Sequence, residues 1–187
     1  NVVIWSVANE TPHGKPRLEF LKKLIAKTRE MDDTRLVSAA MEKDNIDAVT
    51  VTVKDELLEY VDLISFNQYL GWYDGSPEKC DRMKWIFDVK KPVFISEFGG
   101  GAVYGRHGDV NERFTEEYQE ELYLKNVQRF DRIEGLAGTT PWILKDFRSP
   151  RRQIVGTQDD FNRKGLISEQ GGRKKAFYVM KRWYEGK

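Results

Sequence analysis

Short apolar runs of strand length recur along the chain, and more polar stretches separate them. The runs cover residues 2–8, 35–40, 61–66, 92–96 and 133–143. Elsewhere apolar residues recur every three or four positions, the spacing of an amphipathic helix, at 16–31, 76–87, 114–130 and 176–184. A shorter and weaker helix is predicted at 54–60. Strands that alternate with helices predict parallel strands with helical crossovers, which is an α/β fold.

Two architectures fit this alternation: a doubly wound open sheet, and part of an eight-stranded TIM (β/α)8-type barrel. No glycine-rich phosphate loop follows the first strand, which argues against the nucleotide-binding form of the open sheet. Residues suited to chemistry instead follow the predicted strands, where barrels carry their active sites: Glu10, residues 67–73, Glu97 and Trp142. Five strands are too few to close a barrel. We therefore expect residues 1–187 to be a partial barrel without a further domain boundary, cut from a longer protein.

The charge balance argues against nucleic acid and a membrane surface as partners, because 31 basic residues are matched by 30 acidic ones. No apolar run approaches the roughly 20 residues of a membrane span. Cys80 is the only cysteine, which excludes an intrachain disulfide and a cysteine metal cluster. No cofactor and no metal site is predicted. The compartment stays open between the cytoplasm and the periplasm or cell exterior.

Two of the apolar runs end on a glutamate, Glu10 and Glu97. An ionised carboxylate is costly inside a core, so each is expected at the exit of its strand, in a cleft. Two carboxyl groups about 5–5.5 Å apart across a barrel mouth are the equipment of a retaining glycosidase. One is protonated and delivers its proton to the leaving oxygen, and the other is ionised and attacks the sugar carbon. The alternative for either residue is a helix cap or a surface ion pair.

At residues 5–10 (WSVANE) and 95–99 (ISEFG) the chain resembles the catalytic barrel of glycoside hydrolase family 2. This family includes β-galactosidases, β-glucuronidases and β-mannosidases. The resemblance implies that the chain runs from the fourth barrel strand to the helix after the eighth. It also implies that Glu10 is the general acid/base and that Glu97 is the nucleophile.

The same resemblance implies supporting roles for three residues. Asn9 would hold the 2-hydroxyl of the sugar, Tyr69 would donate its hydroxyl to Glu97, and Trp142 would form the floor under the sugar. The alternatives are that Asn9 is a turn residue and that the two aromatic residues are ordinary rim side chains.

Two further segments concern the identity of the sugar. Residues 67–73 are similar to the matching segment of β-glucuronidases, which implies that Tyr73 also lines the pocket. Asn162 and Lys164 match an asparagine and a lysine that hold the substrate carboxylate in β-glucuronidases. An ammonium and an amide N–H would favour a uronic acid over a neutral sugar. Alternatively, Lys164 is one charge of a basic loop, and residues 146–162 are longer than expected for a β-glucuronidase.

The leading hypothesis is a retaining exo-β-glycosidase that hydrolyses β-glucuronides, with a β-galactosidase of the same family as its alternative. The second hypothesis is a protein without catalytic activity: an inactive half-barrel fragment, or a sugar-binding scaffold, that associates through open sheet edges. A third hypothesis is a retaining glycosidase of another family, such as a mannanase or cellulase. The expected partner is a carbohydrate, the β-glycoside substrate. The full-length parent is expected to be a homo-oligomer.

Overall fold

The computed structural model describes residues 1–187 and divides them into two units, each assembled from three separate stretches of sequence. The first unit comprises Asn1–Gln68, Met83–Ser96 and Ile133–Thr139. The second comprises Tyr69–Arg82, Glu97–Arg132 and Thr140–Lys187. The units interleave along the sequence, and the absence of a domain boundary within residues 1–187 stays a prediction.

The five predicted apolar runs become the strands of one sheet, in the order β1-β2-β5-β7-β8. Their bounds are Ile4–Asn9, Leu36–Met41, Ile64–Asn67, Val93–Glu97 and Leu136–Thr139. The pairs β1–β2, β2–β5 and β7–β8 are parallel, which confirms the parallel arrangement predicted from the alternation of strands and helices. The inner strand β5 is buried throughout, whereas half of the edge strand β1 is exposed. Strand β8 is shorter than the predicted run because Gly135, with φ of 74°, turns the chain just before it.

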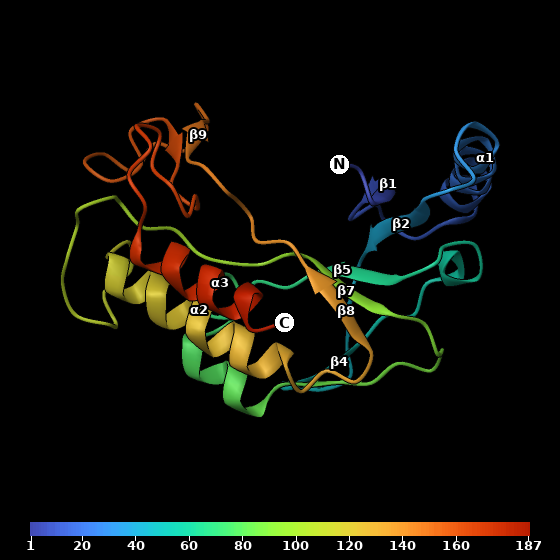
Figure 1. The fold of residues 1–187 in the computed structure, drawn as a ribbon. Coiled ribbons are helices and arrows are strands. Elements are labelled where there is room, and N and C mark those ends of the chain that lie inside the picture. Colours follow the sequence, from blue (N-terminus) through green and yellow to red (C-terminus); the bar gives the residue numbers. More distant parts are fainter. The chain divides into compact units, whose positions relative to one another are not determined.

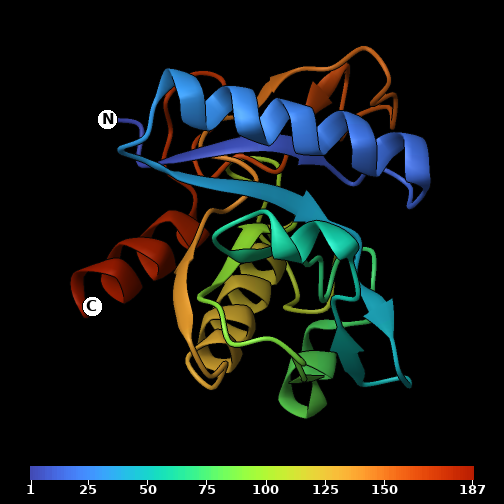
Figure 2. The same cartoon turned by 90° about the vertical axis from the view of Figure 1, so that its right-hand side faces the viewer.

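Helix α1 (Lys15–Met31) lies alongside β1 and β2, as Figure 2 shows. Pro16 occupies the first turn, where its missing N–H costs no hydrogen bond. The helix buries Leu21 and Ile25, as its spacing predicts, but Met31 at its end is 76% exposed. Arg17 binds both oxygens of the Asp55 carboxylate at 2.9 and 2.8 Å, which ties α1 to the 3-10 helix η1 (Glu56–Glu59).

The predicted helix at 76–87 is wrong. Only a 3-10 helix, η2 (Pro77–Arg82), forms, and β6 (Lys84–Trp85) then pairs in parallel with β4 (Thr50–Thr52). Strand β3 (Asp44–Asn45) completes this three-stranded sheet. Pairing with a strand more than 30 residues earlier in the chain extends the backbone, and Ile86 is consequently 50% exposed rather than buried on a helix face. The weak helix predicted at 54–60 is η1.

In the second unit, α2 (Glu116–Phe130) and α3 (Lys175–Glu185) run side by side (Figure 1). Thr115 caps α2 by accepting a hydrogen bond from the N–H of Tyr118. The inner face of α2 is as predicted, with Tyr118, Leu122, Val127 and Phe130 buried. The polar stretch after Trp142, for which no element was predicted, contains the antiparallel pair β9 (Phe147–Arg148) and β10 (Phe161–Asn162).

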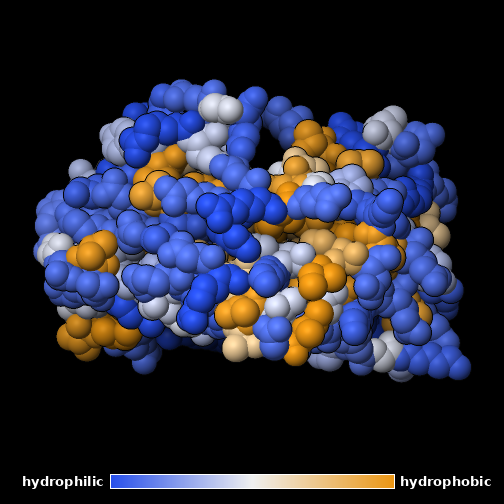
Figure 3. All heavy atoms as spheres, turned by 90° about the horizontal axis from the view of Figure 1, so that it is seen from below, coloured by the Kyte–Doolittle hydropathy of each residue, from blue (hydrophilic) through white to orange (hydrophobic).

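Hydrophilic residues cover most of the face seen in Figure 3, and apolar residues form separate patches among them. Scattered exposed apolar side chains are normal for folded proteins. No helix of the structure has the length and apolar character needed to cross a membrane.

The packing of α1 can be tested by truncating its buried face. Ile25 is 4% exposed, so Ile25→Ala should lower the free energy of unfolding by about 2–5 kcal/mol, because a cavity replaces the lost side chain. Phe20 on the same helix is 64% exposed, and Phe20→Ala is the matched control, expected within about 0.5 kcal/mol of the unaltered protein. Urea unfolding measures both values. Equal effects of the two substitutions would contradict the assigned buried face.

Candidate active site

Glu10 directly follows the last residue of β1, Asn9. Its backbone N–H donates to the carbonyl of Ala40 in β2 at 2.9 Å, and its φ is 47°. This left-handed conformation costs a residue with a side chain roughly 1–2 kcal/mol. Backbone strain of this kind is concentrated at functional sites, so the turn at Glu10 fits a role beyond structure.

Asn67, the last residue of β5, holds the end of β1. Its Nδ2 donates to Oδ1 of Asn9 and to Oε1 of Glu10, both at 3.0 Å. Its Oδ1 accepts a hydrogen bond from the hydroxyl of Ser96 at 2.8 Å. Asn67 is only 3% exposed, so its position is set by packing as well as by these bonds. The sequence places Asn67 in a segment of interest but does not single it out; the available signal is an asparagine that directly follows a mostly apolar run.

A cleft of about 420 Å³ opens beside Glu10 in the first unit. Apart from Met41, its lining is polar or charged: Glu10, His13, Glu42, Lys43, Asp44 and Asn67. A ligand rich in hydroxyl groups could exchange hydrogen bonds with such a lining.

In the second unit, Glu97 accepts the hydrogen bond that the sequence predicts from Tyr69, with Oη and Oε2 2.6 Å apart. Burial raises the pKa of Tyr69, and the hydrogen bond and charge of Glu97 raise it further, so the phenol remains a donor. Gly99 follows closely, with φ of 130°, and a Cβ there would lie 2.2 Å from the buried hydroxyl of Tyr123. Only glycine lets the chain pass Tyr123 at this point.

Lys164 is buried, at 4% exposure, yet its ammonium donates to a neutral partner, the hydroxyl of Tyr73, at 2.8 Å. The ammonium also lies 4.8 Å from the centre of the Tyr73 ring, and that ring meets the ring of Tyr69 edge-on at 5.1 Å. Burial lowers the pKa of Lys164, although the hydrogen bond to Tyr73 acts in the opposite direction. The geometry therefore links Lys164 to Glu97 through two tyrosines.

Asn162 lies next to Lys164, as the sequence predicts from their spacing. Its Oδ1 accepts the backbone N–H of Lys164 at 3.1 Å, and its side chain is buried. Because the oxygen is engaged in this bond, the amide N–H group is the part of Asn162 that can donate to a ligand.

Trp142 follows β8 and is half-buried. Its backbone N–H donates to the carbonyl of Phe98 at 2.8 Å, which places Trp142 beside the residue that follows Glu97. Its ring meets that of Phe147 edge-on, with 6.1 Å between ring centres.

The predicted site residues thus fall into two sets. Asn9 and Glu10 belong to the first unit, and the rest belong to the second: Tyr69, Tyr73, Glu97, Trp142, Asn162 and Lys164. Within each unit, hydrogen bonds join the site residues into short networks. No cluster of three or more His, Cys, Asp or Glu side chains is placed to hold a metal ion.

Comparison with protein families gives one match over nearly the whole chain: the TIM barrel domain of glycosyl hydrolases family 2 matches residues 1–186. The chain is 30% identical to a β-glucuronidase of Paenibacillus borealis over 99% of this chain and 31% of that protein. It is 34% identical to the β-glucuronidase of Rattus norvegicus over 98% of this chain and 28% of that protein. The chain therefore spans about a third or less of the curated relatives it matches.

Solved structures give a similar result. A GH2 β-galacturonidase from Eisenbergiella tayi, bound to galacturonate, superimposes with a TM-score of 0.79 at 25% identity, covering 98% of this chain and 33% of that one. The β-D-glucuronidase of Dictyoglomus thermophilum superimposes with a TM-score of 0.73 at 28% identity, covering 98% and 32%.

The role of Asn67 can be tested through stability. Asn67→Ala removes three hydrogen bonds from a buried position and should lower the free energy of unfolding by about 1–3 kcal/mol. Asn45→Ala changes an exposed asparagine and should stay within about 0.5 kcal/mol of the unaltered protein. Chemical denaturation gives both numbers. If Asn67→Ala were as harmless as Asn45→Ala, the bonds to Asn9 and Glu10 would not hold this edge of the sheet.

Proposed function

The chain belongs to glycosyl hydrolase family 2, and on that basis we propose that the protein is a retaining exo-β-glycosidase that hydrolyses β-glucuronides. The observation that carries the choice of sugar is the buried Lys164, whose ammonium is bound to a neutral phenol rather than to a carboxylate. The similarity to β-glucuronidases over 98–99% of the chain supports the same choice.

The proposed reaction is a double displacement by Glu10 and Glu97. The carboxylate of Glu97 attacks the anomeric carbon and forms an ester bond, while the bond from that carbon to the aglycone oxygen breaks and Glu10 protonates the departing oxygen. Glu10, now ionised, then takes a proton from water. The water oxygen attacks the anomeric carbon, the ester to Glu97 breaks, and the sugar leaves with its original β configuration.

Tyr69 and Asn67 support the two carboxyl groups in this scheme. Tyr69 donates to one oxygen of Glu97 and so orients the carboxylate for attack with the other. Asn67 donates to Glu10 and to Asn9, and the second bond occupies the oxygen of the Asn9 amide. The amide N–H group of Asn9 is then suited to bind the 2-hydroxyl of the sugar.

Lys164 and Asn162 are proposed to bind the carboxylate of the sugar, with Tyr73 beside them and Trp142 as the floor of the pocket. A uronate offers the Lys164 ammonium a charge-assisted hydrogen bond, roughly twice as strong as a neutral one. A galactoside or other neutral sugar would offer this buried ammonium no carboxylate, and its hydrogen bond would remain the one to the neutral phenol of Tyr73. This favours a uronide over the β-galactoside alternative.

A β-galacturonide is the second candidate substrate, because a β-galacturonidase with bound galacturonate is among the similar structures. Galacturonate and glucuronate carry the same carboxylate and differ in the orientation of one hydroxyl. Turnover of the two p-nitrophenyl uronides decides between them.

The support that Tyr69 gives to Glu97 is testable by Tyr69→Phe. A hydrogen bond to a charged group contributes about 1.5–3 kcal/mol, so kcat on p-nitrophenyl β-glucuronide should fall about 10- to 100-fold. Tyr178→Phe, on the exposed face of α3, is the matched control and should leave kcat unchanged. An unchanged kcat in Tyr69→Phe would remove Tyr69 from the mechanism.

The uronate site is testable by Lys164→Met. The substitution should lower kcat/KM for the β-glucuronide about 10- to 100-fold, because a charge-assisted bond worth about 1.5–3 kcal/mol is lost, and should leave kcat/KM for the neutral β-glucoside nearly unchanged. Exposed Lys23→Met is the control. Since burial lowers the pKa of Lys164, KM for the glucuronide should also rise at a lower alkaline pH than for an exposed lysine, and Lys164→Met should abolish this rise. Equal losses on both substrates would contradict the assignment.

A further inference from the structure

Lys174 and Asp146 form an ion pair in the second unit whose side chains are both completely buried. The ammonium of Lys174 donates to both carboxylate oxygens of Asp146 at 2.9 Å, to the carbonyl of Ala102 at 2.7 Å and to that of Arg163 at 3.0 Å. A buried pair of this kind must offset a large desolvation penalty, and an apolar pair of similar volume often stabilises a protein as well or better. Stability alone therefore gives no reason for these charges.

The pair holds the peptide on both sides of Lys164. On one side, Lys174 binds the carbonyl of Arg163, and on the other, Oδ1 of Asp146 accepts the N–H of Gly165 at 2.7 Å. Gly165 packs so closely that a Cβ there would lie 2.2 Å from the backbone nitrogen of Asp146. The backbone that carries Lys164 is thus fixed by the buried pair at both of its neighbours.

The charges near the pair are balanced. Arg163 donates to Glu169 at 2.7 Å and lies 3.7 Å from Asp146, so two cations and two carboxylates neutralise one another. Lys164 stands outside this balance, with the hydroxyl of Tyr73 as its hydrogen-bond partner. The arrangement positions Lys164 without neutralising it, which is what a group that binds an anion requires.

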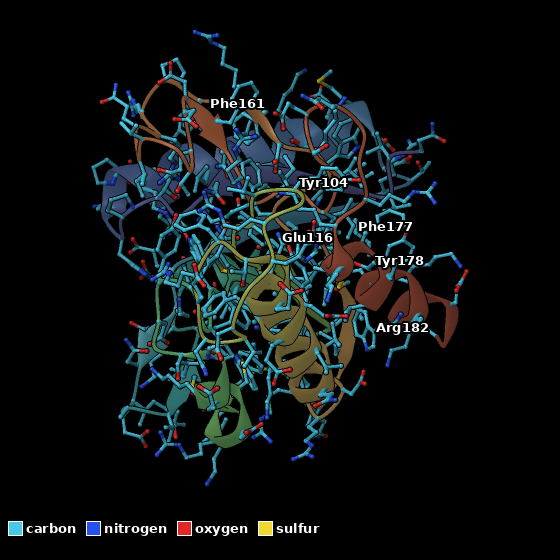
Figure 4. The ribbon with its side chains drawn as sticks, turned by 90° about the vertical axis from the view of Figure 1, so that its left-hand side faces the viewer. Tyr104, Glu116, Phe161, Phe177, Tyr178 and Arg182 are labelled. Carbon is cyan, nitrogen blue, oxygen red and sulfur yellow. The ribbon has the colours of Figure 1, made fainter.

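The pair also connects residues 163–165 to the glycine-rich loop after Glu97. The ammonium of Lys174 donates to the carbonyl of Ala102, and the N–H of Ala102 donates to the carbonyl of Arg163 at 3.0 Å. Glu116 reinforces the same corner. Its carboxylate accepts the N–H of Gly105 at 2.7 Å and that of Lys175, the first residue of α3, at 2.8 Å. Figure 4 shows Glu116 at the start of α2, near the beginning of α3.

We propose that Lys174 and Asp146 are positioning residues that hold Lys164 in place, and that they thereby determine the preference of the site for a sugar with a carboxylate. The proposal rests on the uronate site proposed above. Neither residue touches the substrate; both act through the peptide groups that flank Lys164.

The test is the double substitution Asp146→Leu/Lys174→Met in the full-length protein, which removes both charges and leaves neither buried alone. Calorimetry measures the dissociation constants of two isofagomine inhibitors that differ only in a carboxylate. A misplaced Lys164 forfeits its charge-assisted hydrogen bond to the inhibitor carboxylate, so the dissociation constant of the uronic inhibitor should rise about 10- to 100-fold. That of the neutral inhibitor should change less than about twofold. Lys181→Met, an exposed lysine of α3, is the control and should change neither.

Equal weakening of both inhibitors would mean that the pair serves the fold as a whole and would overturn the proposal, as would the absence of any change. If the double variant does not fold by circular dichroism, Asp146→Asn/Lys174→Met, in which asparagine is nearly isosteric with aspartate and no charge is buried alone, carries the same two expectations. Lys164→Met distinguishes failure of the proposed uronate site from failure of the positioning role. If Lys164→Met does not weaken the uronic inhibitor more than the neutral one, both the uronate site and the positioning role are wrong. If it does, and the variants of the buried pair do not, only the positioning role is wrong.

Discussion

The hydrogen bond from Tyr69 to Glu97 is the interaction on which the candidate site of the second unit depends. A carboxylate at the end of an apolar strand loses much of its hydration and must be held by donors if it is to stay charged and oriented. Tyr69 can serve only as a donor, because burial and the neighbouring charge raise its pKa. The same phenol meets the ring of Tyr73, which in turn binds Lys164. Two aromatic side chains therefore connect the proposed nucleophile to the proposed anion-binding ammonium.

Glu10 is exposed, but a side-chain donor also orients its carboxyl group, and this donor is an amide rather than a phenol. Asn67 is buried at the end of β5. Its amide group donates hydrogen bonds to the side chains of Asn9 and Glu10 and accepts one from the hydroxyl of Ser96. Glu10 itself adopts a strained backbone conformation. In the first unit, a buried polar side chain and a strained backbone conformation thus meet at one glutamate, which is unfavourable for folding alone and understandable if Glu10 reacts.

The family, the parallel sheet and the partial barrel could all be predicted from local features, because apolar runs that end on Glu10 and Glu97 are visible in the sequence and the family match confirms the resemblance. The helix predicted at 76–87 was wrong because β6 pairs with β4, a contact distant in sequence. The pairing of Lys174 with Asp146 could not be predicted from the sequence for a related reason. Each resembles an ordinary surface charge in its own segment, and only the fold brings them together across 28 residues.

Capture of the covalent intermediate tests the central claim, that Glu97 attacks the sugar of a uronide. A 2-deoxy-2-fluoro-β-glucuronyl fluoride slows both steps of a retaining mechanism, and its good leaving group lets the glycosyl-enzyme ester accumulate. Mass spectrometry of the digested full-length protein should find one adduct, on Glu97. An adduct on another carboxylate, or inactivation without any adduct, would contradict the account.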